Sequence, residues 1–153
     1  MKLNDILNLP KEYGAFDIRE FVPPQIWNRF KEQSVMMMDP KVFDIAVLYR
    51  TYFDVPIIIN NWFIGGPYMY RGYRPPRVNV GAEFSQHKTG RAFDCHSPSI
   101  SPQEMYKMIL KDPQLFMDAG LTTLEDISFT KTWLHSDCRI VTTTTDILIV
   151  KPI

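Results

Sequence analysis

The feature that most constrains this chain is a motif from Ser85 to Asp94, followed further along by a second motif that contains His135. Zinc binds imidazole nitrogen and carboxylate oxygen in tetrahedral geometry, and in catalytic sites it keeps one position for water. His87, Asp94 and His135 would supply three ligands and leave that fourth position open. Gly90 allows a sharp turn between the first two ligands. The sequence therefore predicts a Zn²⁺ site built from these three side chains.

The residues around the ligands indicate two β-strands. Residues 91–94 alternate as a strand does, which places Ala92 and Asp94 on one face. A second strand through His135 would bring the third ligand from a neighbouring ladder position. A lone histidine is usually a packing residue, but two of the chain's three histidines fall on this pattern with the aspartate between them. Metal ligation is therefore the favoured interpretation.

The pattern Ser-x-His-x-x-Gly-x-Ala-x-Asp, followed by a late Trp-x-His, resembles the D-Ala-D-Ala metallopeptidase family. This family includes zinc D,D-carboxypeptidases, phage L-alanyl-D-glutamate endolysins and the related hedgehog signalling fold. The first motif matches at every specified position, and weaker similarity extends over residues 16 to 140. The resemblance implies a phage-type zinc peptidase, either a carboxypeptidase or an endopeptidase, that hydrolyses peptide bonds of bacterial peptidoglycan as an endolysin or a virion-associated lysin.

A zinc peptidase needs a general base that takes a proton from the attacking water and returns it to the leaving amine. Many family members place an acidic residue three positions before the last histidine ligand. Here that position is Thr132, which cannot act as the general base. Asp137 lies on the same strand face as His135 and is the first choice for the base. The run from His135 to Arg139 also resembles a His-x-Asp-x-Arg pattern of some phage-type members.

Other residues remain open as alternatives to Asp137. His96 shares the strand face of Asp94 and could be the base, an oxyanion donor or an alternative ligand. Glu125 and Asp126 precede the second ligand strand and could reach in from a loop.

The long irregular segment from 61 to 84 is rich in Gly, Pro, Tyr and Arg, and such segments usually form lids or binding loops. Arg74 matches the arginine of the family's S-G-Y-R turn, which implies contact with the substrate carboxylate or the developing oxyanion. Alternating tyrosines and arginines could also stack on bases, as in single-strand binders. For Arg71 and Arg77, bracing of the loop by stacking on tyrosine is the favoured interpretation.

The composition limits the classes of partner that the chain is expected to bind. Lys plus Arg and Asp plus Glu number 17 each, so the net charge is zero, which argues against a nucleic-acid partner or an anionic membrane. No apolar run approaches the roughly 20 residues of a membrane span. The N-terminus shows no signal peptide. A cell-wall enzyme of this kind would stay in the host cytoplasm until release to the cell wall, or travel in a virion with virion proteins as candidate partners.

A single domain over residues 1–153 is expected, with residues 1–22 as an N-terminal arm that includes a short helix near Leu3 and Ile6. Proline and capping signals predict helices that begin near residues 24, 40, 102 and 113. Strands are expected at 55–60, 91–95, 132–141 and 146–150, the last two paired antiparallel through a turn at 142–145. The fold class is α+β, with a central antiparallel sheet flanked by helices, hedgehog- or D,D-peptidase-like.

Two further interpretations concern the cysteines and the possibility of lost activity. Cys95 and Cys138 are expected to be reduced thiols packed behind the metal face, with a disulfide between adjacent strands as the alternative. The alternative function is a catalytically inactive metal-binding protein of the same fold, for example a structural virion component. Thr132 is the residue that favours it.

Overall fold

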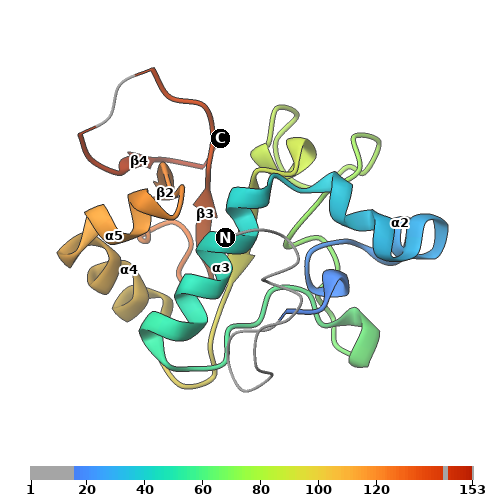
Figure 1. Ribbon diagram of the computed structural model, residues 1–153, viewed down its shortest axis with the longest axis horizontal. Helices are drawn as coiled ribbons and strands as arrows, with labels where there is room; N and C mark the ends of the chain where they lie inside the picture. Colours follow the sequence, from blue (N-terminus) through green and yellow to red (C-terminus); the bar gives the residue numbers. More distant parts are fainter. Residues whose placement is uncertain (1–15, 143–144, 153) are drawn as a thin grey trace.

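The computed structural model describes residues 16–142 and 145–152 of the chain. The predicted short helix near Leu3 and Ile6, and most of the expected N-terminal arm, lie outside the described residues. The α-helices are α2 (Pro24–Phe30), α3 (Pro40–Phe53), α4 (Pro102–Lys111) and α5 (Pro113–Asp118). Shorter 3₁₀ helices are η1 (Ile18–Glu20), η2 (Lys31–Met37), η3 (Trp62–Ile64) and η4 (Gln86–Thr89). In Figure 1, α4 and α5 lie to one side of α3, and α2 lies to the other.

The sheet is mixed rather than antiparallel, so the α+β class is confirmed but the predicted pairing is wrong. Its strands are β1 (Ala92–Cys95), β2 (Thr123–Glu125), β3 (Leu134–Asp137) and β4 (Leu148–Val150), in the order β1-β3-β2-β4. The β1–β3 and β2–β3 pairs are antiparallel, whereas β4 pairs in parallel with β2. The sequence did not mark β2 as a strand, because three residues are too few to show an alternating pattern. With β2 in the sheet, β3 and β4 are separated and form no hairpin.

The predicted strand at 55–60 is present as a single bridge. Ile58 exchanges two backbone hydrogen bonds with His96, of 2.8 and 3.1 Å, whereas the backbone N–H of Asn60 donates to Glu20 instead. The apolar run therefore reflects burial, since Ile57 and Ile59 are both in the core, and not a regular ladder.

The predicted helix starts are confirmed, because they depend on local chemistry. The Asp39 side chain accepts from the backbone N–H of Lys41 at the start of α3. Ser101 and Glu104 form a reciprocal capping box at the start of α4. Proline occupies an early position in α2, α3, α4 and α5.

The core lies between the sheet and the helices. Phe93 of β1 and Ser136 of β3 pair across the sheet, and both contact Tyr49 of α3. The Tyr49 ring also packs against Phe116 of α5. Side chains alternate between the faces of a strand, so the residues next to Phe93 and Ser136 point away from this core. The fold thus directs Asp94, and the neighbours of Ser136, to the opposite face of the sheet.

Both cysteines are buried and free, which confirms the prediction of packed, reduced thiols. The alternative of a disulfide is wrong because of the strand register. Cys95 pairs with Leu134 at one end of β3, whereas Cys138 follows the other end of that strand. No helix within the described parts of the chain is long and apolar enough to cross a membrane.

The buried hydrogen bond between Tyr49 and Ser136 gives a test of the core. The two hydroxyl oxygens are 2.7 Å apart, and both residues are fully buried. We expect Tyr49→Phe to lower the free energy of unfolding by about 1–2 kcal/mol, because Ser136 is left without its partner. Urea denaturation measures the effect. Tyr52→Phe is the control, since the Tyr52 hydroxyl makes no hydrogen bond within the described residues, and equal losses in both variants would contradict the prediction.

Candidate metal centre

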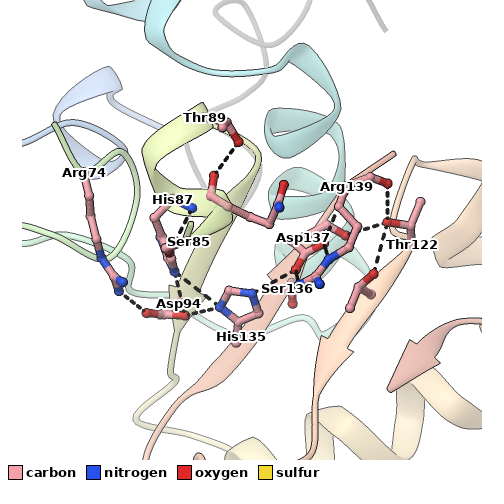
Figure 2. Close-up of polar contacts among 12 residues, drawn as sticks. Arg74, Ser85, His87, Thr89, Asp94, Thr122, His135, Ser136, Asp137 and Arg139 are labelled. Carbon is pink, nitrogen blue, oxygen red and sulfur yellow. Dashed lines mark hydrogen bonds and ion pairs between the residues drawn. The ribbon is translucent and has the colours of Figure 1, made fainter. Parts of the chain in front are cut away.

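Three buried side chains meet on the face of the sheet that points away from α3 (Figure 2). His87 Nε2 lies 3.2 Å from Asp94 Oδ1 and 3.3 Å from His135 Nδ1, and His135 Nδ1 lies 2.8 Å from Asp94 Oδ1. Around a tetrahedral zinc ion with bonds of about 2.0–2.1 Å, ligand atoms stand about 3.3–3.4 Å apart. The triangle therefore needs to open only slightly to hold an ion. The three residues that the sequence predicted as ligands are brought together and could bind a metal ion.

The strand register places two of these side chains. Asp94 of β1 and His135 of β3 are direct partners in the antiparallel ladder. Side chains at directly opposite positions have Cβ atoms about 4.5–5.5 Å apart, on the same face of the sheet. A slip of the register by one residue would send one of them into the core. The pairing of β1 with β3 thus sets the basic geometry of the centre.

A short turn of 3₁₀ helix, η4, places the third side chain. The Ser85 side chain caps this turn and accepts from the backbone N–H of His87, and Gly90 ends it with φ of +70°. A Cβ atom on Gly90 would lie 1.9 Å from the backbone oxygen of Met37. Only glycine fits both this conformation and this close approach. The predicted turn between the first two ligands is therefore confirmed.

Each histidine is held through the ring nitrogen that faces away from the centre. His87 Nδ1 donates to the backbone oxygen of Gly72 at 2.7 Å, and His135 Nε2 donates to Asp137 Oδ2 at 3.0 Å. Gly72 can approach because it has no side chain: a Cβ atom there would lie 2.1 Å from the backbone oxygen of Phe21. Such outer hydrogen bonds fix the tautomer and orientation of metal-binding histidines. They leave His87 Nε2 and His135 Nδ1 directed at the centre.

Asp137 has a different role from the predicted general base. It is fully buried, and its carboxylate accepts from His135 and from three nitrogen atoms of Arg139, at 2.5–3.1 Å. A carboxylate with its acceptor sites occupied in this way cannot readily take a proton from water. Asp137 therefore orients His135, and Arg139 orients Asp137. The His-x-Asp-x-Arg pattern, which begins on β3 and ends two residues after it, was the sequence signal for this arrangement.

Arg74 lies at the centre and bonds to a protein carboxylate, and its contact with a substrate carboxylate or oxyanion stays a prediction. Its Nη2 atom donates to Asp94 Oδ2 at 2.9 Å, and its Nε atom donates to the backbone oxygen of Tyr70 at 2.7 Å. Asp94 therefore presents Oδ1 to the histidines and Oδ2 to Arg74. The result is a chain of alternating charges on one face of the sheet, running through Arg74, Asp94, His135, Asp137 and Arg139.

His96 lies outside the cluster. Its Nδ1 atom is 2.6 Å from a guanidinium nitrogen of Arg71, and its ring packs against that of Tyr68. The Arg71 guanidinium also stacks on Tyr68, 3.5 Å from the ring centroid. The stacking predicted for Arg71 is thus confirmed. The sequence-based roles of His96 as base or ligand have no support in this arrangement, because its ring is engaged away from the three ligand atoms.

The electrostatics of the metal-free centre assign its proton to His135. Burial lowers the pKa of His135, but its hydrogen bonds to Asp137 and Asp94 outweigh this and raise the pKa to about 10. Burial lowers the pKa of His87. Burial raises the pKa of Asp94, yet the charges and hydrogen bonds of the two histidines bring it well below its ordinary value. At neutral pH, His135 is therefore an imidazolium, while His87 is neutral and Asp94 is ionised.

A cavity of about 370 Å³ opens onto the centre. Its lining includes the three cluster residues together with Arg74, Glu125, Phe84, Trp133 and Arg139. A second cavity of about 310 Å³ is lined by Tyr68, Tyr70 and Arg71, and it shares Arg74, Val80, Asp94 and Trp133 with the first. Trp133 lines both cavities. Asp94 of the cluster lies where the two cavities meet, whereas His87 and His135 line the larger one.

Comparisons of the chain with family models, with curated proteins and with solved structures found no match. The resemblance to the D-Ala-D-Ala metallopeptidases therefore rests on the motif residues, and the family stays a prediction.

The cluster predicts one divalent ion per chain. We expect His87→Ala, Asp94→Ala and His135→Ala each to abolish tight binding, because each removes one of three ligands. His96→Ala is the matched control and should keep full binding, since His96 lies outside the cluster. Elemental analysis after dialysis, together with calorimetric titration, measures the stoichiometry. Loss of the ion in the His96 variant, or its retention in a ligand variant, would contradict this assignment.

The pKa of His135 predicts proton release on metal binding. The ring is protonated in the metal-free protein at pH 7, and a metal ion at Nδ1 must replace that proton. We expect about one proton released per ion, and metal affinity rising about tenfold per pH unit between pH 7 and the pKa of about 10. Calorimetry in buffers of different ionisation enthalpy counts the protons. Binding without proton release at pH 7 would show that His135 is already neutral.

Proposed function

We propose that this protein is a zinc-dependent peptidase that hydrolyses peptide bonds of bacterial peptidoglycan, with a fold like that of the hedgehog and D,D-peptidase group. The observation that carries the proposal is the convergence of His87 Nε2, Asp94 Oδ1 and His135 Nδ1 beside a cavity. Two nitrogen donors and one oxygen donor suit zinc, and three protein ligands leave a position for water. The motif resemblance supplies the substrate class.

When bound, zinc would polarise the scissile carbonyl and lower the pKa of a bound water toward about 7. The chain's own residues prepare the site for this chemistry. Gly72 and Asp137 hold the two imidazole rings, so that the nitrogens facing the centre are available as ligands. Arg74 holds the second oxygen of Asp94 and favours one-oxygen ligation. This arrangement limits reorganisation of the ligands during the reaction.

The charges of the cleft suit a peptide that carries carboxylates. Arg74 and Arg139 border the larger cavity together with Lys151. Peptidoglycan stem peptides carry free carboxylates on D-glutamate and on terminal D-alanine, and guanidinium groups bind carboxylates in a directed way. The exposed ring of Phe84, at the same cavity, offers an apolar contact for the peptide chain.

The arrangement of the two cavities favours an endopeptidase over a carboxypeptidase. They meet at Arg74, Asp94 and Trp133, so a substrate chain could continue on both sides of the centre. A carboxypeptidase needs to close one side around a chain terminus, whereas an endopeptidase needs room on both. Release in a phage infection, or delivery in a virion, is the route to the cell wall that we propose for such an enzyme.

One observation favours the second candidate function, a metal-binding protein without turnover. Thr132 is exposed and has no acid–base chemistry, and Asp137 is buried and fully hydrogen-bonded. Neither the family position nor the first alternative therefore offers a general base. The choice between the two functions depends on whether another residue can fill that role.

The test is release of soluble peptide fragments from purified peptidoglycan by the zinc-loaded protein. We expect the wild-type protein and His96→Ala to release fragments, and His87→Ala and chelator-treated protein to release none. Mass spectrometry of the products identifies the bond that is cut. A wild-type protein that binds zinc but leaves purified walls from several bacteria intact would favour the non-catalytic candidate.

A further inference from the structure

The structure places an unengaged carboxylate beside the centre, and we propose that Glu125 is the general base of the reaction proposed above. This inference rests on that proposed function and completes it, because it fills the role that Thr132 and Asp137 cannot fill. The assignment depends on the position of Glu125 in the sheet, its place in the cavity and its lack of protein partners.

The strand register brings Glu125 to the centre. In the antiparallel pair of β2 and β3, Thr123 is opposite Asp137, and Leu124 is opposite Ser136. If this register is continued one step beyond these two pairs, Glu125 comes beside His135. Thr123 and Glu125 share a face of β2 because side chains alternate, and this is the face that Asp137 and His135 occupy on β3. Glu125 therefore emerges on the metal face, from the strand next to the one that carries a ligand.

Glu125 lines the larger cavity together with His87, Asp94 and His135. Its side chain makes no hydrogen bond or ion pair within the described residues, and the residue is only half-buried. Its negative charge contributes to the raised pKa of both His135 and Arg139, which places it within electrostatic reach of the centre. Its oxygens are free to accept a proton from a water molecule held in the cavity.

The other carboxylates near the centre are engaged elsewhere. Asp94 and Glu125 are the two acidic residues among those that line the cavity, and Asp94 is held by both histidines and by Arg74. Asp137 is enclosed by His135 and Arg139. Asp126 follows Glu125 directly but accepts from the backbone and hydroxyl of Ser128 at the surface. Glu125 is thus the carboxylate with both access and free acceptor sites.

The proton balance of the step is simple. Glu125 takes one proton from water as the water oxygen bonds to the carbonyl carbon of the scissile amide. The same proton passes from Glu125 to the amide nitrogen as the carbon–nitrogen bond breaks, which leaves a carboxylic acid and an amine. The carboxylate is then ready for a second cycle without any other reactant.

The first experiment compares Glu125→Gln with the wild-type protein, and uses Glu32→Gln as an exposed control distant in sequence from the motifs. We expect Glu125→Gln still to bind one zinc ion, and to lose about 10²–10⁴-fold in kcat with little change in KM. The acid limb of the pH profile of kcat/KM should disappear in this variant, and Glu125→Asp should restore part of the rate. Activity of Glu125→Gln within about fivefold of wild type would overturn the proposal.

A second measurement tests the role of Glu125 without catalysis. Its result can therefore be distinguished from a failure of the proposed function. Acetohydroxamate binds zinc through two oxygens, and a neighbouring carboxylate accepts a hydrogen bond from it. We expect the zinc-loaded Glu125→Gln protein to bind acetohydroxamate about tenfold more weakly than the wild type and Glu32→Gln, as loss of a charged hydrogen bond predicts. Equal affinity in all three proteins would overturn the role of Glu125, even if the wild type cleaves peptidoglycan. A tenfold difference in a protein that cleaves nothing would support the position of Glu125 and reject the proposed substrate.

Discussion

The pairing of β1 with β3 is the constraint on which the centre depends. This register sets Asp94 directly opposite His135 on one face, and Phe93 directly opposite Ser136 on the other. The second pair packs against Tyr49 of α3, so the helix that completes the core also holds the register. Because the core face and the metal face are two sides of the same strands, packing and ligand geometry cannot vary independently.

The charges of the centre are arranged so that the three inner members of the series, Asp94, His135 and Asp137, each have an opposite charge on either side. Arg74 and Arg139 form the two ends of the series, and Asp94 and Asp137 lie on either side of His135. Removing one member of such a network leaves its neighbours as buried charges without a partner, in a site that water solvates poorly. Asp137, which its spacing suggested as the general base, therefore works as a structural support for His135.

The sequence predicted the parts of the site that are local in the chain. His87, Gly90 and Asp94 belong to one short motif, and the helix starts at Asp39 and Ser101 follow from capping chemistry within a few residues. Pairing between distant segments was harder to predict. The short strand β2 shows no pattern of its own, and without it neither the parallel partner of β4 nor the position of Glu125 could be placed.

Prediction of the roles of polar residues was also limited, because these roles depend on the three-dimensional surroundings of each side chain. Asp137 and Glu125 are both acidic and both close to the second motif, and sequence spacing favoured Asp137. The structure separates them by environment, since one is enclosed by Arg139 and the other faces a cavity. Likewise, the carbonyl of Gly72 orients His87 through a backbone atom, which residue type alone does not reveal.

The hydrogen bonds of His135 affect how folding of the chain is related to binding of the proposed ion. In the metal-free protein, its imidazolium joins Asp94 to Asp137 and keeps the ring in the orientation that a ligand needs. The proton on His135 Nδ1 therefore occupies the position that the metal ion would take. The chain can therefore fold with the His135 ring already oriented, and binding of the proposed ion would replace a proton on that ring.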